Sequence, residues 1–143
     1  MSIRTLTLAG FATLALAAPA FAGNTAVVVQ SGGFNSSSIS QAGRVNTAVT
    51  VQHGLVNSAS TSQVGRFNSS AIGQVGRFNT AVTNQKGLVN SSGILQVGRN
   101  NTAVATQKGL INGVAIEQHG RNNAAGVGQN GLFNSASVSQ RRH

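Results

Sequence analysis

Hydrophobic and polar positions recur with a period of eleven residues between residues 24 and 140. Each period contains a seven-residue segment that begins with Asn and ends with a Gln, followed by four residues with Gly in second place. Alternate residues of a segment form two sides, and in 112–118 one side consists of Asn112, Val114, Ile116 and Gln118. Because the side chains of a β-strand point alternately to opposite faces, the pattern predicts one strand per period.

The marker residues of this repeat occupy a strict lattice. Every Gln of the chain lies on it, at Gln30, Gln41, Gln52, Gln63, Gln74, Gln85, Gln96, Gln107, Gln118, Gln129 and Gln140. The Asn positions are Asn24, Asn35, Asn46, Asn57, Asn68, Asn79, Asn90, Asn101, Asn112, Asn123 and Asn134. The Gly positions are Gly32, Gly43, Gly54, Gly65, Gly76, Gly87, Gly98, Gly109, Gly120 and Gly131. A fixed period without insertions is typical of repeat architectures.

Two architectures have a period of eleven residues. One is a right-handed coiled coil, in which eleven residues make three helical turns at about 3.67 residues per turn. A Gly in every unit and abundant Asn, Ser, Thr and Val disfavour such a helix. In the strand interpretation the Gly segment reverses the chain, because Gly adopts positive φ at little cost. Two strands and two reversals make a coil, and stacked coils predict an all-β fold. We expect a two-sheet parallel β-solenoid over 23–143, with eleven half-repeats or about five and a half coils.

The repeated Gln and Asn residues fall on the predicted inner side of the strands. A primary amide both donates and accepts hydrogen bonds, so identical amides one coil apart can form a ladder between the sheets. A buried amide without a partner costs about 1–3 kcal/mol, which such a ladder avoids. The alternative is that these amides are solvated loop groups. Their strict position on one strand face favours the ladder.

The first 22 residues differ from the repeat. Arg4 precedes an apolar run over 6–18, which is followed by Pro19 and by an Ala-x-Ala sequence that ends at Ala22. These features predict a secretory signal peptide over 1–22, removed after Ala22. A membrane anchor is the alternative, but the run is shorter than the ~20 apolar residues that a spanning helix needs. We therefore expect a secreted protein that acts outside the cell.

The composition excludes several classes of function. The chain has 10 Lys or Arg residues, 1 acidic residue and no Cys. These counts exclude paired catalytic carboxylates, a disulfide scaffold and a thiolate metal site. His53 and His119 lie three coils apart in the predicted stack, about 14 Å, which is too far to share a metal ion. We expect no enzymatic activity, no metal, no cofactor and no small-molecule substrate.

Most reversals carry a basic residue beside the Gly. These residues are Arg44, Arg66, Arg77, Lys86, Arg99, Lys108 and Arg121. Stacked coils would align them into basic columns along the two edges of the solenoid. One interpretation is that the formal charge of +9 provides solubility and slows premature assembly. The other is sequence-independent, salt-sensitive binding of extracellular DNA or an anionic polysaccharide.

The N-x5-Q-x-G-x-x-N lattice behind a signal peptide resembles the curlin repeat of curli fibre subunits over residues 24–140. The resemblance implies a secreted bacterial subunit, either the major or the nucleating one. Such subunits pass through an outer-membrane pore and polymerise end to end, with a companion subunit, into functional amyloid fibres. These fibres serve adhesion and aggregation at the cell surface and in the biofilm matrix. Many members begin alternate strands with Ser, whereas here every strand begins with Asn.

The outward strand positions divide into Thr-x-Val and Ser-rich types. In the predicted coils the first two Thr strands, at Thr25 and Thr47, fall on one sheet. The last two, at Thr80 and Thr102, fall on the other, so the types change sheets between Gln63 and Asn79. An ice-binding solenoid needs one continuous Thr face, which disfavours that alternative. A non-polymerising extracellular solenoid that binds an anionic polymer as an adhesin is the remaining alternative.

Overall fold

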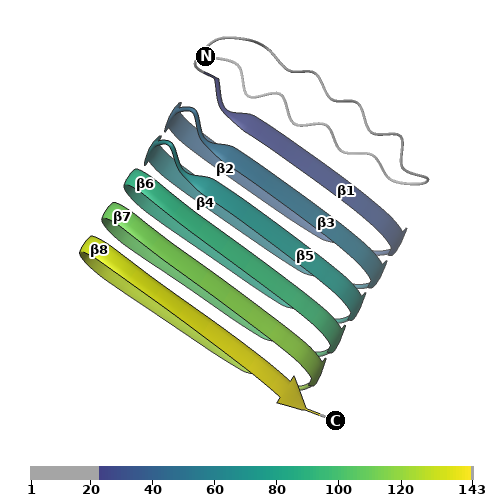
Figure 1. The fold of residues 1–143 in the computed structure, drawn as a ribbon. Coiled ribbons are helices and arrows are strands. Elements are labelled where there is room, and N and C mark those ends of the chain that lie inside the picture. Colours follow the sequence, from purple (N-terminus) through teal and green to yellow (C-terminus); the bar gives the residue numbers. More distant parts are fainter. Residues whose placement is uncertain (1–22, 143) are drawn as a thin grey trace.

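The computed structural model describes residues 23–142, so the predicted signal peptide lies outside the described residues. The strands are β1 (Thr25–Gly33), β2 (Ser36–Arg44), β3 (Thr47–Leu55), β4 (Ser58–Arg66), β5 (Ser69–Arg77), β6 (Thr80–Arg99), β7 (Thr102–Arg121) and β8 (Ala124–Arg142). Figure 1 shows them as successive turns of one flattened coil. Between residues 23 and 142 no helix has the length and apolar character that crossing a membrane requires.

The strands form two layers, and each segment pairs in parallel with the segment 22 residues further along, as in Thr25↔Thr47. The first layer contains the segments 25–33, 47–55, 69–77, 91–99, 113–120 and 135–142. The second layer contains the segments 36–44, 58–66, 80–87, 102–109 and 124–131. We call one segment with its following corner a half-coil. This arrangement confirms the predicted all-β, two-sheet parallel β-solenoid.

Burial alternates along each strand because the two faces meet different surroundings. In β3, the side chains of Ala48 and Thr50 are fully enclosed, whereas Val51 is 45% exposed. The inner face of each layer packs against the other layer, and the outer face meets solvent. The period-two pattern of the sequence therefore determines which residues form the core.

The core between the layers is thin and consists of small or β-branched side chains. Ile72, Ile94 and Ile116 stack in register along the first layer and are almost completely buried. Ala81 and Ala103 are buried in the second layer and belong to the same cluster. Short side chains opposite the Ile column let the two sheets approach each other closely.

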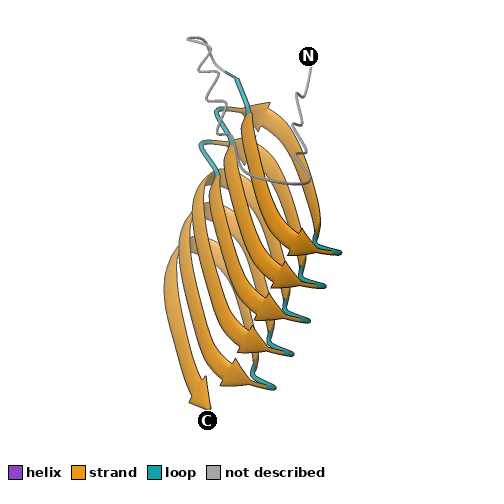
Figure 2. Cartoon of the chain, turned by 90° about the vertical axis from the view of Figure 1, so that its right-hand side faces the viewer, coloured by secondary structure: helices purple, strands orange, loops and turns teal. Residues whose placement is uncertain are grey.

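The corners at the two edges of the solenoid differ. At the first edge the chain passes from the first to the second layer, and the residue before Asn always has positive φ: Phe34, Val56, Phe78, Asn100 and Asn122. At the second edge only Val45 and Phe67 adopt it. The later corners of that edge lie inside β6, β7 and β8, which continue through the turn. Figure 2 accordingly shows loops along the whole of one edge and only at the earliest coils of the other. Sequence analysis predicted one kind of reversal, whereas the fold uses two.

Candidate functional site: amide ladders and basic edges

The Gln side chains form one continuous ladder in each layer. In the first layer Gln30 donates from Nε2 to Oε1 of Gln52 at 2.6 Å, and Gln52 donates in turn to Gln74 at 2.7 Å. In the second layer the ladder runs from Gln41 through Gln63 and Gln85. Every one of these bonds points toward the later coils, ending at Gln140 and Gln129. The Gln ladders therefore have a direction.

The Asn side chains form two ladders of the opposite direction. Asn46 donates from Nδ2 to Oδ1 of Asn24 at 3.0 Å, and Asn68 donates to Asn46 at 2.9 Å. In the second layer Asn57 likewise donates from Nδ2 to Oδ1 of Asn35 at 3.0 Å. Each bond between Asn side chains thus points toward the earlier coil, whereas each bond between Gln side chains points toward the later one. Sequence reasoning missed this opposition, because it placed the amides but not their oxygen and nitrogen atoms.

The second hydrogen of the Gln amide fixes its orientation. Gln63 donates from Nε2 to the backbone oxygen of Thr47 at 3.0 Å, across to the other layer. The same bond, to the residue sixteen positions earlier, recurs at Gln41 and at every Gln from Gln74 to Gln140, but not at Gln52. Since only nitrogen can donate to a carbonyl, the amide oxygen must face the preceding Gln. The backbone oxygen of the opposite layer therefore orients the Gln amide, and this orientation gives the Gln ladder its direction.

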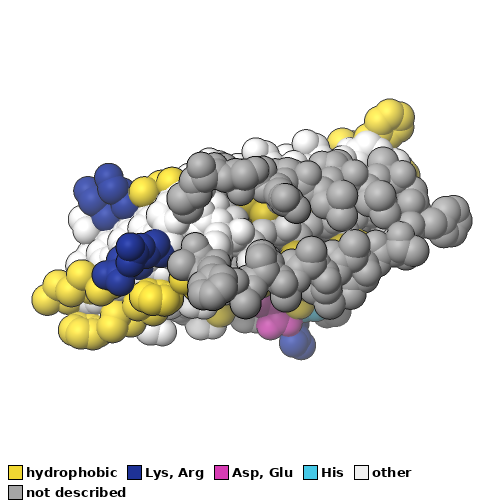
Figure 3. Space-filling model, turned by 90° about the horizontal axis from the view of Figure 1, so that it is seen from above, with side chains coloured by type: hydrophobic (Ala, Val, Ile, Leu, Met, Phe, Trp, Pro, Cys, Tyr) yellow, Lys and Arg dark blue, Asp and Glu magenta, His cyan; other side chains and the backbone are white. Residues whose placement is uncertain are grey.

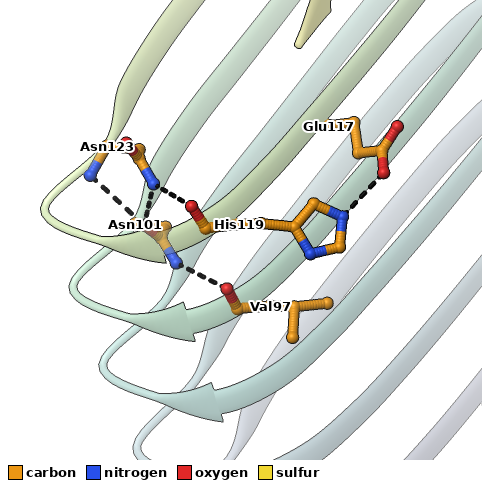
Figure 4. Close-up of polar contacts among 5 residues, drawn as sticks. All are labelled: Val97, Asn101, Glu117, His119 and Asn123. Atoms are coloured by element: carbon orange, nitrogen blue, oxygen red, sulfur yellow. Dashed lines mark hydrogen bonds and ion pairs between the residues drawn. The ribbon is translucent and has the colours of Figure 1, made fainter. Parts of the chain in front are cut away.

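The Asn side chains also hold the corners. Asn101 donates from Nδ2 to the backbone oxygen of Val97 at 3.4 Å and to Oδ1 of Asn79 at 3.1 Å. Asn123 makes the equivalent bond to the backbone oxygen of His119 at 2.9 Å (Figure 4). Each such Asn closes its own corner and joins it to the corner of the preceding coil. Buried amides are therefore hydrogen-bonded in two directions, along the stack and within the turn.

The corner glycines are required by both conformation and space. Gly65 has φ +133°, and a Cβ built on it would lie 1.8 Å from the backbone oxygen of Gly87 on the next coil. The other corner glycines from Gly32 to Gly120 meet the next coil at similarly short distances. A side chain at these positions would push the coils apart. The glycines thus set the close stacking on which the ladders depend.

The basic residues align in short columns on both edges. Arg77, Arg99 and Arg121 are in register at the first edge. At the second edge Arg44 lies beside Arg66, and Lys86 beside Lys108. Figure 3 shows Lys and Arg side chains next to hydrophobic ones at one edge. The chain's single acidic residue, Glu117, cannot neutralise these columns, so they form strips of uncompensated positive charge.

Apolar side chains accompany the basic columns at the corners. Leu110 is 44% exposed and Leu132 62% exposed, and both follow Leu88 at the second edge. The guanidinium carbon of Arg66 lies 5.8 Å from the ring centre of Phe67. Sequence analysis did not consider these apolar columns. The signal was present, because the residue before Asn is large and apolar at most corners.

The outer face of the first layer has a shallow hollow of about 490 Å³. It lies where Gly73 and Gly93 carry no side chain, and Leu95 and Glu117 contribute to its lining. Glu117 pairs with Nε2 of His119 at 2.6 Å, and both side chains are partly exposed (Figure 4). Among residues 23–142 no group of three potential metal ligands comes together. The described residues bring polar groups together in ladders and columns.

In-register parallel strands joined by stacked amides define this protein as a cross-β repeat solenoid. The family model described as the curlin associated repeat matches residues 57–87, 79–109 and 112–141, which together span more than half of the chain. The chain therefore belongs to the curlin family, whose members are extracellular, cell-surface fibre subunits and not a family of enzymes. No curated protein and no solved structure matches the chain.

Proposed function

We propose that this protein is a structural subunit that assembles end to end into amyloid fibres outside the cell. The observation that carries the proposal is the direction of the ladders. Within residues 23–142 no group donates to Oε1 of Gln30 or Gln41, the first members of the two Gln ladders. At the other end Gln129 and Gln140 donate to the backbone but to no further Gln among the described residues.

The two ends are complementary. The β8 end presents Gln amide hydrogens, and the β1 and β2 end presents the Gln oxygens that can accept them. The Asn ladders run in the reverse sense, because Asn24 and Asn35 are their last acceptors, and Asn123 and Asn134 supply oxygens. Nδ2 of Asn35 already donates to the backbone oxygens of Ser31 and Gly54, so it would share a hydrogen with an incoming Asn, as Asn57 does among its three acceptors. A β8 end therefore continues all four ladders only when it meets a β1 end. Stacking of like ends would face donor with donor, so the favoured assembly is polar.

The assembly is tested with the predicted mature chain, Gly23 to His143. At tens of micromolar we expect fibrils that bind thioflavin T and that diffract at about 4.8 Å along the fibre axis. No cofactor or metal is added. A chain that stays monomeric over days would contradict the proposal.

A substitution confined to one end separates end-to-end addition from general aggregation. Gln140→Glu keeps the oxygens that accept from Gln118 but removes the donor for an incoming subunit and adds a charge. We expect it to slow elongation strongly. Ser139→Glu adds the same charge on the outer face of the same segment and serves as the matched control. Equal elongation rates for the two variants would argue against ladder-directed growth.

The family resemblance supports further elements of this function. We propose that the chain leaves the cell through the secretory pathway and a dedicated outer-membrane pore, that a companion subunit takes part in assembly, and that the fibres serve adhesion and the biofilm matrix. Loss of surface fibres from cells that lack the pore, with the chain retained in the periplasm, is the expected result. Surface fibres in such cells would contradict the export route.

A second candidate function is binding of anionic polymers along the first edge. The Arg77, Arg99 and Arg121 column favours it, because three cations about 4.8 Å apart can contact several anionic groups of one polymer. Extracellular DNA and anionic polysaccharides carry repeated anionic groups along one chain. Since the chain has no Trp or Tyr, which stack on bases, we expect no sequence preference.

A further inference from the structure

The two layers of the described solenoid contain unequal numbers of strands. The first layer begins with β1 and ends with the segment 135–142, whereas the second begins with β2 and ends with 124–131. The first layer therefore has one strand more than the second. A solenoid of whole coils would have equal layers, whereas residues 23–142 begin and end in the same layer, half a coil out of phase.

This inequality restricts how a second copy can stack. If the copy were only translated, its β1 would lie over the segment 135–142 and its β2 would lie one strand too high in the second layer. The segment 124–131 would then face a gap one strand wide, and Gln129 and Asn123 would remain without partners. Buried polar groups left in this way cost about 1–3 kcal/mol each. Translation alone leaves one layer open at every junction.

We propose that successive subunits are related by a half-turn about the solenoid axis, in addition to the ordinary twist of the sheets. This inference rests on the proposed end-to-end assembly. In the half-turned copy β1 continues the second layer over 124–131, and β2 continues the first layer over 135–142. Gln129 then donates to Gln30 of the next copy and Gln140 to its Gln41. Both layers and all four ladders continue without a gap.

The outward side chains provide an independent reason. The first layer ends with Ser135, Ser137 and Ser139, which face outward. A half-turned copy places Ser36, Ser38 and Ser40 directly next to them, followed by the three Ser of β4. A translated copy would place Thr25, Val27 and Val29 there instead. Like residues meet across the junction only with the half-turn.

The same operation accounts for the change of the Thr strands from one layer to the other. Thr80 and Thr102 face outward from the second layer, and Thr25 and Thr47 from the first. After a half-turn, the Thr25 and Thr47 strands of the next copy continue the face that carries Thr80 and Thr102. A band of Thr and Val therefore crosses each junction. It is interrupted only by the segment 124–131, whose outer side carries the small residues Ala124, Gly126 and Gly128. Within one chain the change of layers has no evident purpose, whereas in the stack it restores continuity.

The inner side chains fit this junction. Ala125 and Val127, on the inner side of 124–131, would meet Ala26 and Val28 of the half-turned copy. Identical side chains would stack at the same height, as they do between Ala81 and Ala103 within the chain. In this layer the junction therefore stacks identical core side chains, whereas in the other layer Ala136 and Val138 would meet Ser37 and Ile39.

Cross-linking tests the half-turn, and the chain has no Cys of its own to interfere. With the half-turn, position 137 of one copy lies one coil spacing, about 4.8 Å, from position 38 of the next. With translation, it lies beside position 27. Fibrils of a Ser38→Cys/Ser137→Cys variant and of a Val27→Cys/Ser137→Cys variant are treated with a short bifunctional maleimide. We expect covalent multimers from the first variant and none from the second.

The result separates this inference from the proposed assembly. Multimers from the second variant only, or fibrils that cross-link in neither variant, would overturn the half-turn but leave end-to-end assembly standing. Failure of the unmodified chain to form any fibril would overturn the assembly and the half-turn together. Helical reconstruction of unmodified fibrils provides a second measurement that needs no substitution. A half-turn predicts a rise of about 26 Å per subunit, and translation with the gap predicts about 29 Å.

A deletion of one half-coil tests whether the unequal numbers of strands in the two layers cause the half-turn. Removing residues 124–134 leaves the repeat in phase but gives the two layers equal numbers of strands. We expect fibrils of this variant to stack by translation, with a rise of about 24 Å and no half-turn. A half-turn that persists after the deletion would contradict the dependence on strand number.

Discussion

Gln63 donates from Nε2 to Oε1 of Gln85 at 2.7 Å and accepts from Nε2 of Gln41 at the same distance. All three side chains are buried. The bond along the stack and the bond to the opposite layer use both hydrogens of the Gln63 amide. This side chain therefore has no spare donor and joins three successive coils of the second layer.

Replacing Gln63 with Ala should weaken fibrils markedly. The substitution leaves the Gln41 donor and the Gln85 acceptor buried without partners, at about 1–3 kcal/mol each. We expect the concentration of soluble chain in equilibrium with fibrils to rise by at least about tenfold, which corresponds to 1.4 kcal/mol. Ser58→Ala, at an exposed outward position of the same strand, is the control and should change solubility little. Equal effects would refute the importance of the ladder.

The corner and strand glycines should respond oppositely to substitution by Ala. Gly65→Ala places a Cβ 1.8 Å from the Gly87 oxygen at a positive φ, and we expect fibrils to form far more slowly or not at all. Gly93 lies within β6, and a Cβ there would meet nothing within 4 Å. Gly93→Ala should stabilise the fibril by about 0.5–1 kcal/mol, because Ala loses less backbone freedom. The concentration of soluble chain in equilibrium with fibrils measures the effect of both substitutions on fibril stability. Destabilisation by Gly93→Ala would contradict the second expectation.

Val56 and Val89 occupy the same position before Asn, with similar exposure, but in different corner conformations. Val56 has φ 58°, which disfavours a β-branched residue and suits Asn, as at Asn100. Val56→Asn should therefore stabilise the fibril by about 1 kcal/mol. Val89 lies inside β6, where Asn is a poorer strand residue, so Val89→Asn should be neutral or destabilising. The guanidinium concentration that dissolves half of the fibrils compares the stability of the Val56→Asn and Val89→Asn variants. The same change from both variants would mean that the two corners do not differ.

Replacing Arg77, Arg99 and Arg121 with Gln should weaken the binding of fibrils to duplex DNA and reduce its salt dependence. Each lost phosphate contact lowers the slope of log affinity against log salt by about 0.9. The charge-matched control replaces Arg44, Lys86 and Lys108 of the second edge. Binding is measured by co-sedimentation between about 50 and 200 mM salt. An equal loss in both variants would indicate general charge attraction and no role for the column.

Much of this architecture could be predicted from the sequence, because the lattice fixes which residues face inward. The register of Gln52 with Gln74 follows directly from a repeat without insertions. The direction of the ladders could not be predicted, since it depends on which backbone oxygen Gln63 reaches. The two corner conformations also have no local signal. The sequences His-Gly-Leu-Val-Asn at 53–57 and Lys-Gly-Leu-Val-Asn at 86–90 are almost identical, but only the first places Val at positive φ.

The opposed directions of the Gln and Asn ladders have an electrical consequence. Amide groups aligned head to tail add their dipoles, as the peptide groups of a helix do. Here each coil adds Gln dipoles of one sense and Asn dipoles of the other, while sheets themselves contribute little. The two contributions oppose each other in every coil. A long stack therefore accumulates less axial field than it would if all four ladders ran in one direction, and its two tips stay closer in potential.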